Sequence, residues 1–290
     1  MLQLLFLIVL YLGWNLQPLS AHEEGAPFSG AIIEPLHTHH THIEDEQKVN
    51  LELVENAEVE IKGEHHELDL FRQEIELAWA HPSFRWGGEL KLPFSNQGED
   101  DGQRQYGPGD LEIWFPKYAW INEPERILTT LFAVHAPTGS RSQGLGSGQT
   151  LLEGKIFFDQ AYRNWFLGLN LESSTAVSGS FETKLEYSGV VSYSFIRRTE
   201  RVAPGKPNQF LVVAPLFEVA GEVGLGGEGR GETPVALIGG LYFWNPSTGW
   251  SLRVGYRVGV GEDREEDQAL LLQFGNHFSW PGRESETKMA

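Results

Sequence analysis

Hydrophobic and polar residues alternate along most of the chain from Lys48 onward. In the clearest stretch, residues 250–260, one face carries Trp250, Leu252, Val254, Tyr256, Val258 and Val260, and Ser, Arg and Gly fill the positions between them. A strand with a period of two and an unbroken apolar face has to bury that face. The same alternation recurs in residues 71–79, 84–94 and 181–195. The chain is therefore predicted to be built from amphipathic strands.

The alternation, with the turn signals between its runs, predicts twelve strands: 48–62, 67–80, 83–94, 109–120, 125–137, 151–159, 164–173, 181–196, 209–223, 233–244, 249–261 and 268–280. An even number of strands is typical of bacterial membrane barrels. Most of the links are alternately short and long, and the long polar loops are predicted at 95–108 and 138–150. Pro116 interrupts one strand and predicts a bulge, which would return Lys117 to the face of Asp110 and Glu112.

Two architectures share this alternation, because a soluble sandwich buries the apolar face and a membrane barrel turns it toward lipid. Many of the runs are 11 to 15 residues long, whereas strands of soluble proteins cluster near about 5–6 residues. Aromatic residues stand at strand ends, where the membrane interface lies, and the last strand ends on Trp280. We therefore predict an all-β fold, an antiparallel transmembrane β-barrel of the bacterial outer-membrane type over residues 48–280, in contact with outer-membrane lipid.

The two ends of the chain differ from this barrel. Residues 1–21 contain an apolar run and end in Leu19, Ser20 and Ala21, which predicts a cleaved signal peptide. The run is shorter than the roughly 20 residues of a spanning helix. No Lys or Arg precedes it, so an N-terminal anchor that stays on the chain is the alternative. Residues 281–290 form a short C-terminal tail after Trp280.

Charge and cysteine content exclude several kinds of function. The chain has 22 basic and 40 acidic residues, a net charge of −18. Phosphate binding needs the opposite sign, so nucleic acid is not expected as a partner. With no cysteine, thiolate metal sites and cysteine nucleophiles are excluded.

A polar segment, residues 22–47, precedes the barrel and holds a histidine cluster. Its members are His37, His39, His40 and His42, followed by Glu44, Asp45 and Glu46. Imidazoles at this spacing can bind Zn²⁺, Cu²⁺ or Ni²⁺. The alternative is a solvated tail without a ligand. Metal is thus an expectation for this segment, and the sequence implies no required cofactor.

Catalytic motifs are missing from the sequence, which contains neither G-x-S-x-G nor H-E-x-x-H. The run Gly144–Thr150 lacks the lysine and the spacing of a phosphate-binding loop. His277 and Ser279 share one face of the last strand, and a hydrolase inside the barrel is a third hypothesis. The chain is therefore predicted not to be an enzyme.

The faces opposite the apolar ones would line the barrel lumen. Their charges have both signs, and the candidates for lining a pore are Arg72, Glu76, Arg85, Glu89, Asp110, Glu112, Lys117, Glu182, Lys184, Arg253 and Arg257. Buried charges need partners, so pairing across the wall is one interpretation. The other is that unpaired members set the selectivity of a pore. A barrel of this size predicts a narrow channel, partly occluded by the N-terminal segment.

Glycines and polar residues in 107–148 carry a resemblance to a known family. The pattern consists of Gly107, Gly109, Asp110, Lys117, Tyr118, Pro137, Thr138, Gly139, Gly144, Gly146 and Gly148. It resembles the outer-membrane transporter family named for the MetA pathway of phenol degradation. The resemblance implies passive outer-membrane transport, with hydrophobic or aromatic compounds among the expected solutes. The first hypothesis is thus a channel for small solutes, the alternative a metal-handling protein acting through the histidine cluster. The oligomeric state stays open.

Overall fold

The computed structural model describes residues 33–61, 64–98, 104–177, 183–198, 210–226, 230–245, 249–261, 263–264 and 266–277. Apart from a single 3₁₀ turn, η1 (Arg141–Gln143), its regular elements are strands: β1 (Glu46–Ile61), β2 (Glu64–Ala80), β3 (Trp86–Gly98), β4 (Arg104–Pro108), β5 (Leu111–Glu123), β6 (Arg126–Ala136), β7 (Leu151–Tyr162), β8 (Trp165–Ala176), β9 (Thr183–Tyr193), β10 (Phe195–Arg198), β11 (Phe210–Gly226), β12 (Val235–Asn245), β13 (Trp250–Val260) and β14 (Gln268–His277). None of the helices in this part of the chain is long and apolar enough to cross a membrane.

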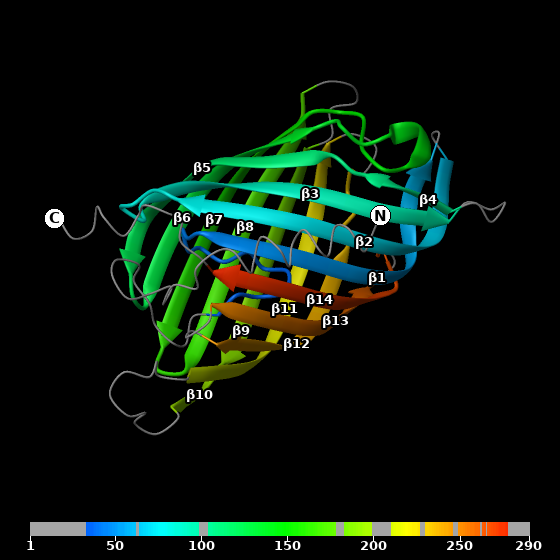
Figure 1. Cartoon of the computed structure of the whole chain (residues 1–290). Coiled ribbons are helices and arrows are strands. Elements are labelled where there is room, and N and C mark those ends of the chain that lie inside the picture. The colour runs from blue at the N-terminus through cyan, green and yellow to red at the C-terminus, as the bar shows by residue number, and fades with distance from the viewer. Residues whose placement is uncertain are drawn as a thin grey trace.

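The strands form one closed antiparallel sheet. Neighbours along the chain pair with each other, and β14 pairs with β1 from Glu46↔His277 to Glu55↔Gln268, which closes the barrel. Both β4 and β5 pair with β3, and both β9 and β10 pair with β11. Each of these couples forms one crossing, so the described residues make a closed barrel of 12 strands, as predicted (Figure 1).

The outer surface of the barrel is apolar, with aromatic side chains near one end. Trp120 and Trp165 are 61% and 53% exposed, and Tyr162, Phe195 and Trp250 are exposed as well. Ring pairs such as Tyr118–Trp120, at 5.0 Å between centroids, continue the belt. A large contiguous apolar surface marks a site of interaction, which for the wall of a barrel is lipid, and aromatic belts lie at the membrane interface. The chain is therefore a bacterial outer-membrane β-barrel, the location that the alternation predicts.

The two ends of the barrel differ in the connections that they carry. One end, which we call the turn end, includes the short links 81–85, 124–125 and 163–164. The other, the loop end, includes the connection 137–150. The aromatic belt, with Trp120 and Trp165, lies toward the turn end.

Three local predictions can be compared with the strands. The bulge at Pro116 is confirmed, because the β5–β6 register shifts between Trp114 and Lys117 and the Lys117 side chain is buried. The predicted long loop at 95–108 is wrong in extent. There β3 continues to Gly98 and pairs with β4, a hairpin supported by stacking of Phe94 on Tyr106 at 6.2 Å. The predicted signal peptide and C-terminal tail lie outside the described residues.

Residues 33–45, which we call the lumen segment, lie inside the barrel and lead into β1 at the turn end. Nearly all of its residues are buried, although it forms no regular secondary structure. Its contacts come from strands on opposite sides of the barrel, among them β7, β11 and β13. The expectation that the N-terminal segment occludes the lumen is thus met by residues 33–45.

Candidate functional site: the barrel lumen and the lumen segment

Glu218 of β11 is the main anchor of the lumen segment. Its carboxylate is fully buried and accepts hydrogen bonds from the backbone N–H groups of Leu36, at 2.7 Å, and Thr38, at 2.6 Å. The N–H of His37 donates to the same group at 3.1 Å. Bonds from several N–H groups to a carboxylate are about twice as strong as neutral ones. One inward side chain therefore fixes the backbone of three consecutive residues.

A second carboxylate, Asp159 of β7, holds the next turn of the segment. It accepts from the N–H of Thr41, at 3.1 Å, and from the Thr41 hydroxyl, at 2.6 Å. Thr129 of β6 donates its hydroxyl to the Thr41 carbonyl at 2.8 Å. The ammonium of Lys117 donates to the His40 carbonyl at 3.3 Å. Backbone groups of this irregular segment are thus satisfied by the barrel wall.

Leu36 packs where two glycines of neighbouring strands leave space. A Cβ at either Gly240 or Gly255 would collide with the Leu36 Cδ1 atom. Leu36 and Ile33 also belong to the buried apolar cluster that includes Ile238 and Tyr242. The glycines on β12 and β13 therefore make room for this apolar contact.

Ion pairs tie the segment to the turn end of the lumen. The carboxylate of Glu34 lies in contact with the guanidinium of Arg253, which also lies 3.4 Å from Glu46. His277 lies between two glutamates, with Nε2 3.0 Å from Glu34 and Nδ1 2.9 Å from Glu44. Because these groups are buried, each charge depends on its partner. Arg253 thus acts on the lumen segment, as an anchor inside the barrel.

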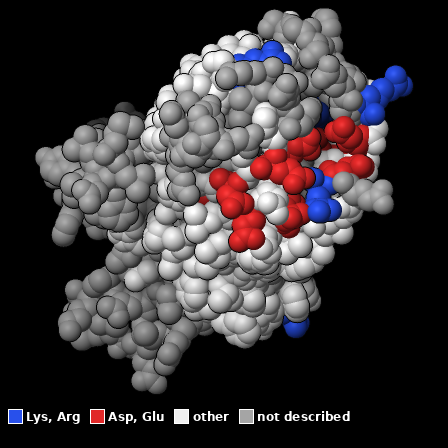
Figure 2. Space-filling view, turned by 90° about the vertical axis from the view of Figure 1, so that its right-hand side faces the viewer, with Lys and Arg blue, Asp and Glu red and all other residues white. Residues whose placement is uncertain are grey.

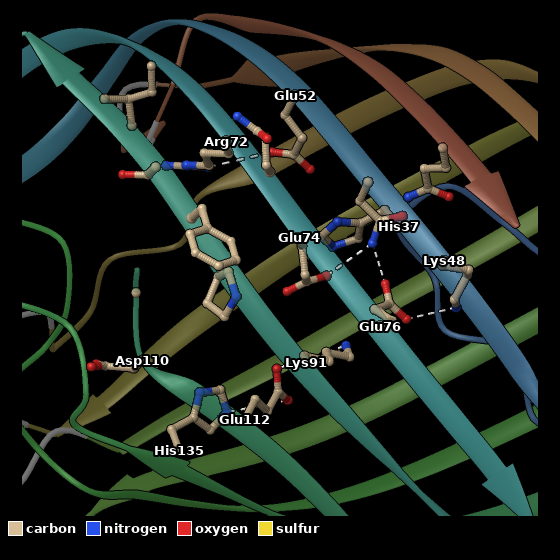
Figure 3. A pocket seen from close by; sticks show the side chains of 18 of the residues that line it. His37, Lys48, Glu52, Arg72, Glu74, Glu76, Lys91, Asp110, Glu112 and His135 are labelled. Carbon is tan, nitrogen blue, oxygen red and sulfur yellow. Dashed lines mark hydrogen bonds and ion pairs between the residues drawn. The ribbon is translucent and has the colours of Figure 1, made fainter. Parts of the chain in front are cut away.

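Toward the loop end the lumen opens into a cavity of about 730 Å³. Its floor is formed by residues 35–40 of the lumen segment, and its walls by β1, β2, β3, β5 and residues 144–147. Figure 2 shows the face at the right of Figure 1, where acidic side chains gather beside a few basic ones. Figure 3 shows charged side chains of both signs projecting from the wall strands into this space. The volume falls in the range of about 300–1,000 Å³ that is usual for small-molecule sites.

Pairing across the wall organises these charges. The ammonium of Lys48 lies 2.8 Å from Glu76, and that of Lys91 lies 3.9 Å from Glu112. Lys91 also stands over the ring of Trp114, 3.8 Å from its centroid. Figure 3 shows Lys48 and Glu76 joined across neighbouring strands. Most charged side chains of the wall are therefore held in ion pairs with one another, and these pairs border the cavity.

Most residues of the family-like pattern meet at the loop end, whereas Lys117 and Tyr118 lie toward the turn end of β5. Asp110 accepts from the N–H of Gly139, at 2.9 Å, and of Ser147, at 2.7 Å. Thr138 donates its hydroxyl to the Gly109 carbonyl at 2.9 Å. A Cβ at Gly139 would approach the Leu145 carbonyl, so close backbone packing requires glycine there. The pattern thus folds the loop over the start of β5, and Asp110 serves as its centre.

The predicted pore-lining residues lie in different parts of the structure. Arg72, Glu76, Asp110, Glu112, Arg253 and Arg257 line the cavity. Glu89 and Lys117 face the lumen beside the lumen segment, and Lys184 pairs with Glu222 at 2.9 Å. The prediction for Arg85 is wrong, because Phe84 adopts a left-handed φ of 49° in the turn before β3, and Arg85 is exposed there. Glu182 lies outside the described residues.

The histidine cluster divides into separate environments. His37 faces the cavity, and His39 packs edge-on against Trp114 at 4.7 Å. His40 and His42 lie together, with ring centroids 5.9 Å apart. Enclosure in the barrel lowers the pKa of His37 to about 4, and burial likewise lowers the pKa values of His39, His40 and His42. The four imidazoles therefore do not converge on one point, and metal binding by this segment stays a prediction.

Some lumen residues are not apparent from the sequence. Trp114 points inward in phase with Glu112, a position that the charged lumen candidates do not include. Thr41 binds Asp159 and Thr129, but in the sequence it is only one hydroxyl residue in a polar stretch, which does not indicate this role. His277 of the hydrolase hypothesis is held by glutamates, and its partner Ser279 lies outside the described residues.

Comparisons with known proteins agree with this architecture. No model of a known protein family matches the sequence, and no curated protein matches it. The fold is shared with solved outer-membrane barrels. The COG4313 outer membrane channel from Pseudomonas putida F1 aligns with a TM-score of 0.56 and 13% identity, over 85% of this chain and 100% of that one. LpxR from Salmonella typhimurium gives a TM-score of 0.48 and 7% identity, over 80% and 100%. The KdgM porin gives 0.46 and 8%, over 81% and 99%. At these identities the likeness establishes the fold, and the resemblance to the MetA-pathway family stays a hypothesis.

Proposed function

We propose that this barrel is a channel for the passive passage of small solutes across the outer membrane, and that the lumen segment closes it. The observation that carries this proposal is the packing of residues 33–45 across a polar lumen, beneath a cavity that faces the loop end. The packing is non-covalent and consists of hydrogen bonds, ion pairs and the Leu36 contact. The segment can therefore withdraw toward the turn end without breaking the barrel.

The cavity lining favours small polar solutes. Its wall carries Lys48, Arg72 and Lys91 beside Glu52 and Glu74, and its polar and charged side chains outnumber the apolar ones. Charged walls of both signs stabilise hydrated or zwitterionic molecules better than hydrophobic ones. The hydrophobic or aromatic solutes that the family resemblance implies are thus the less favoured class.

A metal-handling role has one specific observation in its favour. His40, His42 and Glu44 bring their possible ligand atoms within 4.8 Å of one another. This geometry supports a local site on the lumen segment, whereas the channel proposal accounts for the whole lumen.

Liposome flux measurements test the channel. We expect the purified protein to pass small sugars and amino acids slowly, and a variant lacking residues 22–44 to pass them at least ~10-fold faster, since the floor of the cavity is gone. Phenol and benzoate measured beside them decide the solute class. Equal, background-level flux in both proteins would contradict the channel. A preference for the aromatic compounds would overturn the polar-solute proposal and support the family resemblance.

A further inference from the structure

The turn end of the lumen segment concentrates metal-ligating side chains over five residues. His40, His42 and Glu44 each offer one ligand atom, all within 4.8 Å of one another. The Nδ1 atom of His40 lies 3.4 Å from Oε1 of Glu44. Glu34 and Glu46 stand beside His40 and Glu44 in an overlapping group of the same kind. Two imidazoles and a carboxylate therefore converge from one short stretch of chain.

Each of these three side chains has a buried polar atom without a hydrogen-bond partner. His40 Nδ1, His42 Nε2 and Glu44 Oε1 are all enclosed and accept or donate no hydrogen bond. His40 and Glu44 are 8% and 9% exposed. Leaving buried polar atoms unsatisfied is unfavourable, so a ligand that occupies them is favoured. The other oxygen of Glu44 is held by His277 at 2.9 Å, so the carboxylate is already oriented.

A small cavity adjoins these atoms. Its volume of about 10 Å³ for the centre of a water-sized sphere is lined by His40, His42, Glu44, Glu89 and Lys117. A space of this size takes one water molecule or one ion. The Lys117 ammonium donates to the His40 carbonyl, and Glu89 supplies a carboxylate on the other wall. The space thus has the size and the donor set of a single-ion site.

A second group of three possible metal ligands serves as a contrast. Glu112, His135 and Glu153 also bring ligand atoms together, but the Lys155 ammonium lies 3.4 Å from Glu112 and 2.7 Å from Glu153. A lysine already fills the cation position there. At His40, His42 and Glu44 a lysine, Lys117, also lines the cavity, but its ammonium donates to the His40 carbonyl.

We propose that His40, His42 and Glu44 form a site for one divalent transition-metal ion, with water or a further carboxylate completing the coordination. Two imidazoles, one carboxylate and an open position are a known donor set for Zn²⁺, and Co²⁺ and Ni²⁺ take the same ligands. Hard cations such as Mg²⁺ and Ca²⁺ prefer all-oxygen sites and are excluded by the imidazoles. The ligand atoms have to close by about 1 Å to reach bonds of about 2.0–2.2 Å.

The ion would also fasten the lumen segment. Its ligands lie within the segment, and its cavity wall comes from β2, β3 and β5 through Trp79, Gly88, Glu89 and Lys117. Withdrawal of the segment would take the bound ion out of this enclosed space. A consequence that rests on the proposed channel is therefore that Zn²⁺ slows solute passage and a chelator restores it.

Metal binding is measured on the full mature protein in detergent, after treatment with a chelator. Zn²⁺ is titrated by calorimetry, and Co²⁺ by the visible absorption that tetrahedral cobalt with imidazole ligands gives. The test variants are H40Q/H42Q and, separately, Glu44→Gln. The matched control is H37Q/H39Q, which removes two imidazoles of the same segment that lie elsewhere. Heat-modifiable migration on gels verifies that each barrel is folded.

We expect the wild type to bind one Zn²⁺ at this site, and the H40Q/H42Q protein to bind at least ~100-fold more weakly, because loss of two ligands exceeds the ~10–100-fold cost of losing an outer partner. H37Q/H39Q should bind as the wild type does. Absence of Zn²⁺ binding in the wild type, or equal binding by the two double variants, would overturn the site. If H40Q/H42Q does not fold, Glu44→Gln decides in the same way. Because binding is measured without solute, a barrel that conducts nothing would contradict the channel and leave the metal site standing.

Discussion

The lumen of this barrel has a filled part and an open part that are built from the same kind of inward-facing residue. In the filled part, Glu218 and Asp159 are completely buried against the lumen segment. In the open part, the side chain of Arg72 is 41% exposed and faces the cavity together with Glu52. Alternation places polar residues inside in both parts. Whether a part of the lumen is filled or open therefore depends on the lumen segment, and the alternation of the wall residues alone does not define a pore.

The two parts also differ in the partners of their wall carboxylates. In the open part, carboxylates pair with cations of neighbouring strands, as Glu76 does with Lys48. In the filled part, Glu218 and Asp159 accept hydrogen bonds from N–H and hydroxyl groups of the segment. Removal of the segment would expose these two carboxylates to water, which lowers the cost of withdrawal. The filled part is thus suited to reversible occupation, and the open part to permanent structure.

The largest single-residue effect is expected at the anchor of the filled part. Glu218→Gln removes the charge that strengthens three hydrogen bonds, a loss of roughly 1–3 kcal/mol that shifts the segment about 10- to 100-fold toward withdrawal. Sugar flux into liposomes should rise accordingly. Glu222→Gln is the matched control, because Glu222 lies on the same strand and pairs with Lys184 instead of the segment. Equal flux in the two variants would show that Glu218 does not hold the passage closed.

Two arginines of β13 allow the filled part and the open part to be tested separately. Arg253 contacts Glu34 of the lumen segment, whereas Arg257 pairs with Glu52 at 3.1 Å and with Glu266. Arg253→Gln should raise sugar flux about tenfold, less than a fully broken buried pair because His277 still neighbours Glu34.

Arg257→Gln should leave sugar flux unchanged and shift the cation-to-anion permeability ratio upward by about two- to fivefold, from an interaction of about 1 kcal/mol. The ratio is measured as a reversal potential in planar bilayers. If both substitutions changed selectivity alone, Arg253 would belong to the open part and its anchoring role would be contradicted.

The smallest effect is expected from pH. Desolvation inside the barrel lowers the pKa of His37 to about 4 even though its side chain is exposed to the cavity, and the cations Arg257, Lys91 and Lys155 act in the same direction, against Glu52. A withdrawn segment regains the ordinary value near 6.5. Between these two values only the withdrawn state binds the proton, so acidification favours withdrawal and neutral pH favours the packed segment.

Conductance of the protein, freed of metal by a chelator, should therefore rise about threefold from pH 7.5 to 5.5. This rise is smaller than the full pKa difference would give, because His37 faces the water of the cavity. His37→Gln should flatten part of this rise, and the remaining histidines of the segment account for the rest. A pH dependence that His37→Gln leaves untouched would remove His37 from the effect.

Much of the barrel could be predicted from the sequence, because each spanning strand carries its own period of two. The inward position of Lys117 followed from Pro116, since one extra residue reverses the face. The turn before β3 could not be predicted in this way, because nothing in the sequence shows that Phe84 adopts a positive φ. Alternation assigns a face to every residue, including some, such as Arg85, that belong to turns.

The interior of the barrel was less accessible to sequence reasoning. The partners of Glu218 are backbone N–H groups, which every residue except proline has, so no residue pattern marks them. The histidine cluster was visible in the sequence, but its division into separate environments depends on how the segment bends around Asp159 and Glu218. Contacts between segments distant in sequence set these features.

A reversible cross-link tests most directly whether withdrawal of the lumen segment opens the passage. The chain has no cysteine, so Leu36→Cys with Gly255→Cys introduces one defined pair. The Leu36 side chain reaches the position of a Cβ at Gly255, which suits the ~3.5–4.5 Å between Cβ atoms of a disulfide. We predict that the oxidised protein forms this bond and passes no more sugar than empty liposomes, and that reduction restores flux. Rapid flux through the oxidised, fully cross-linked protein would contradict the account.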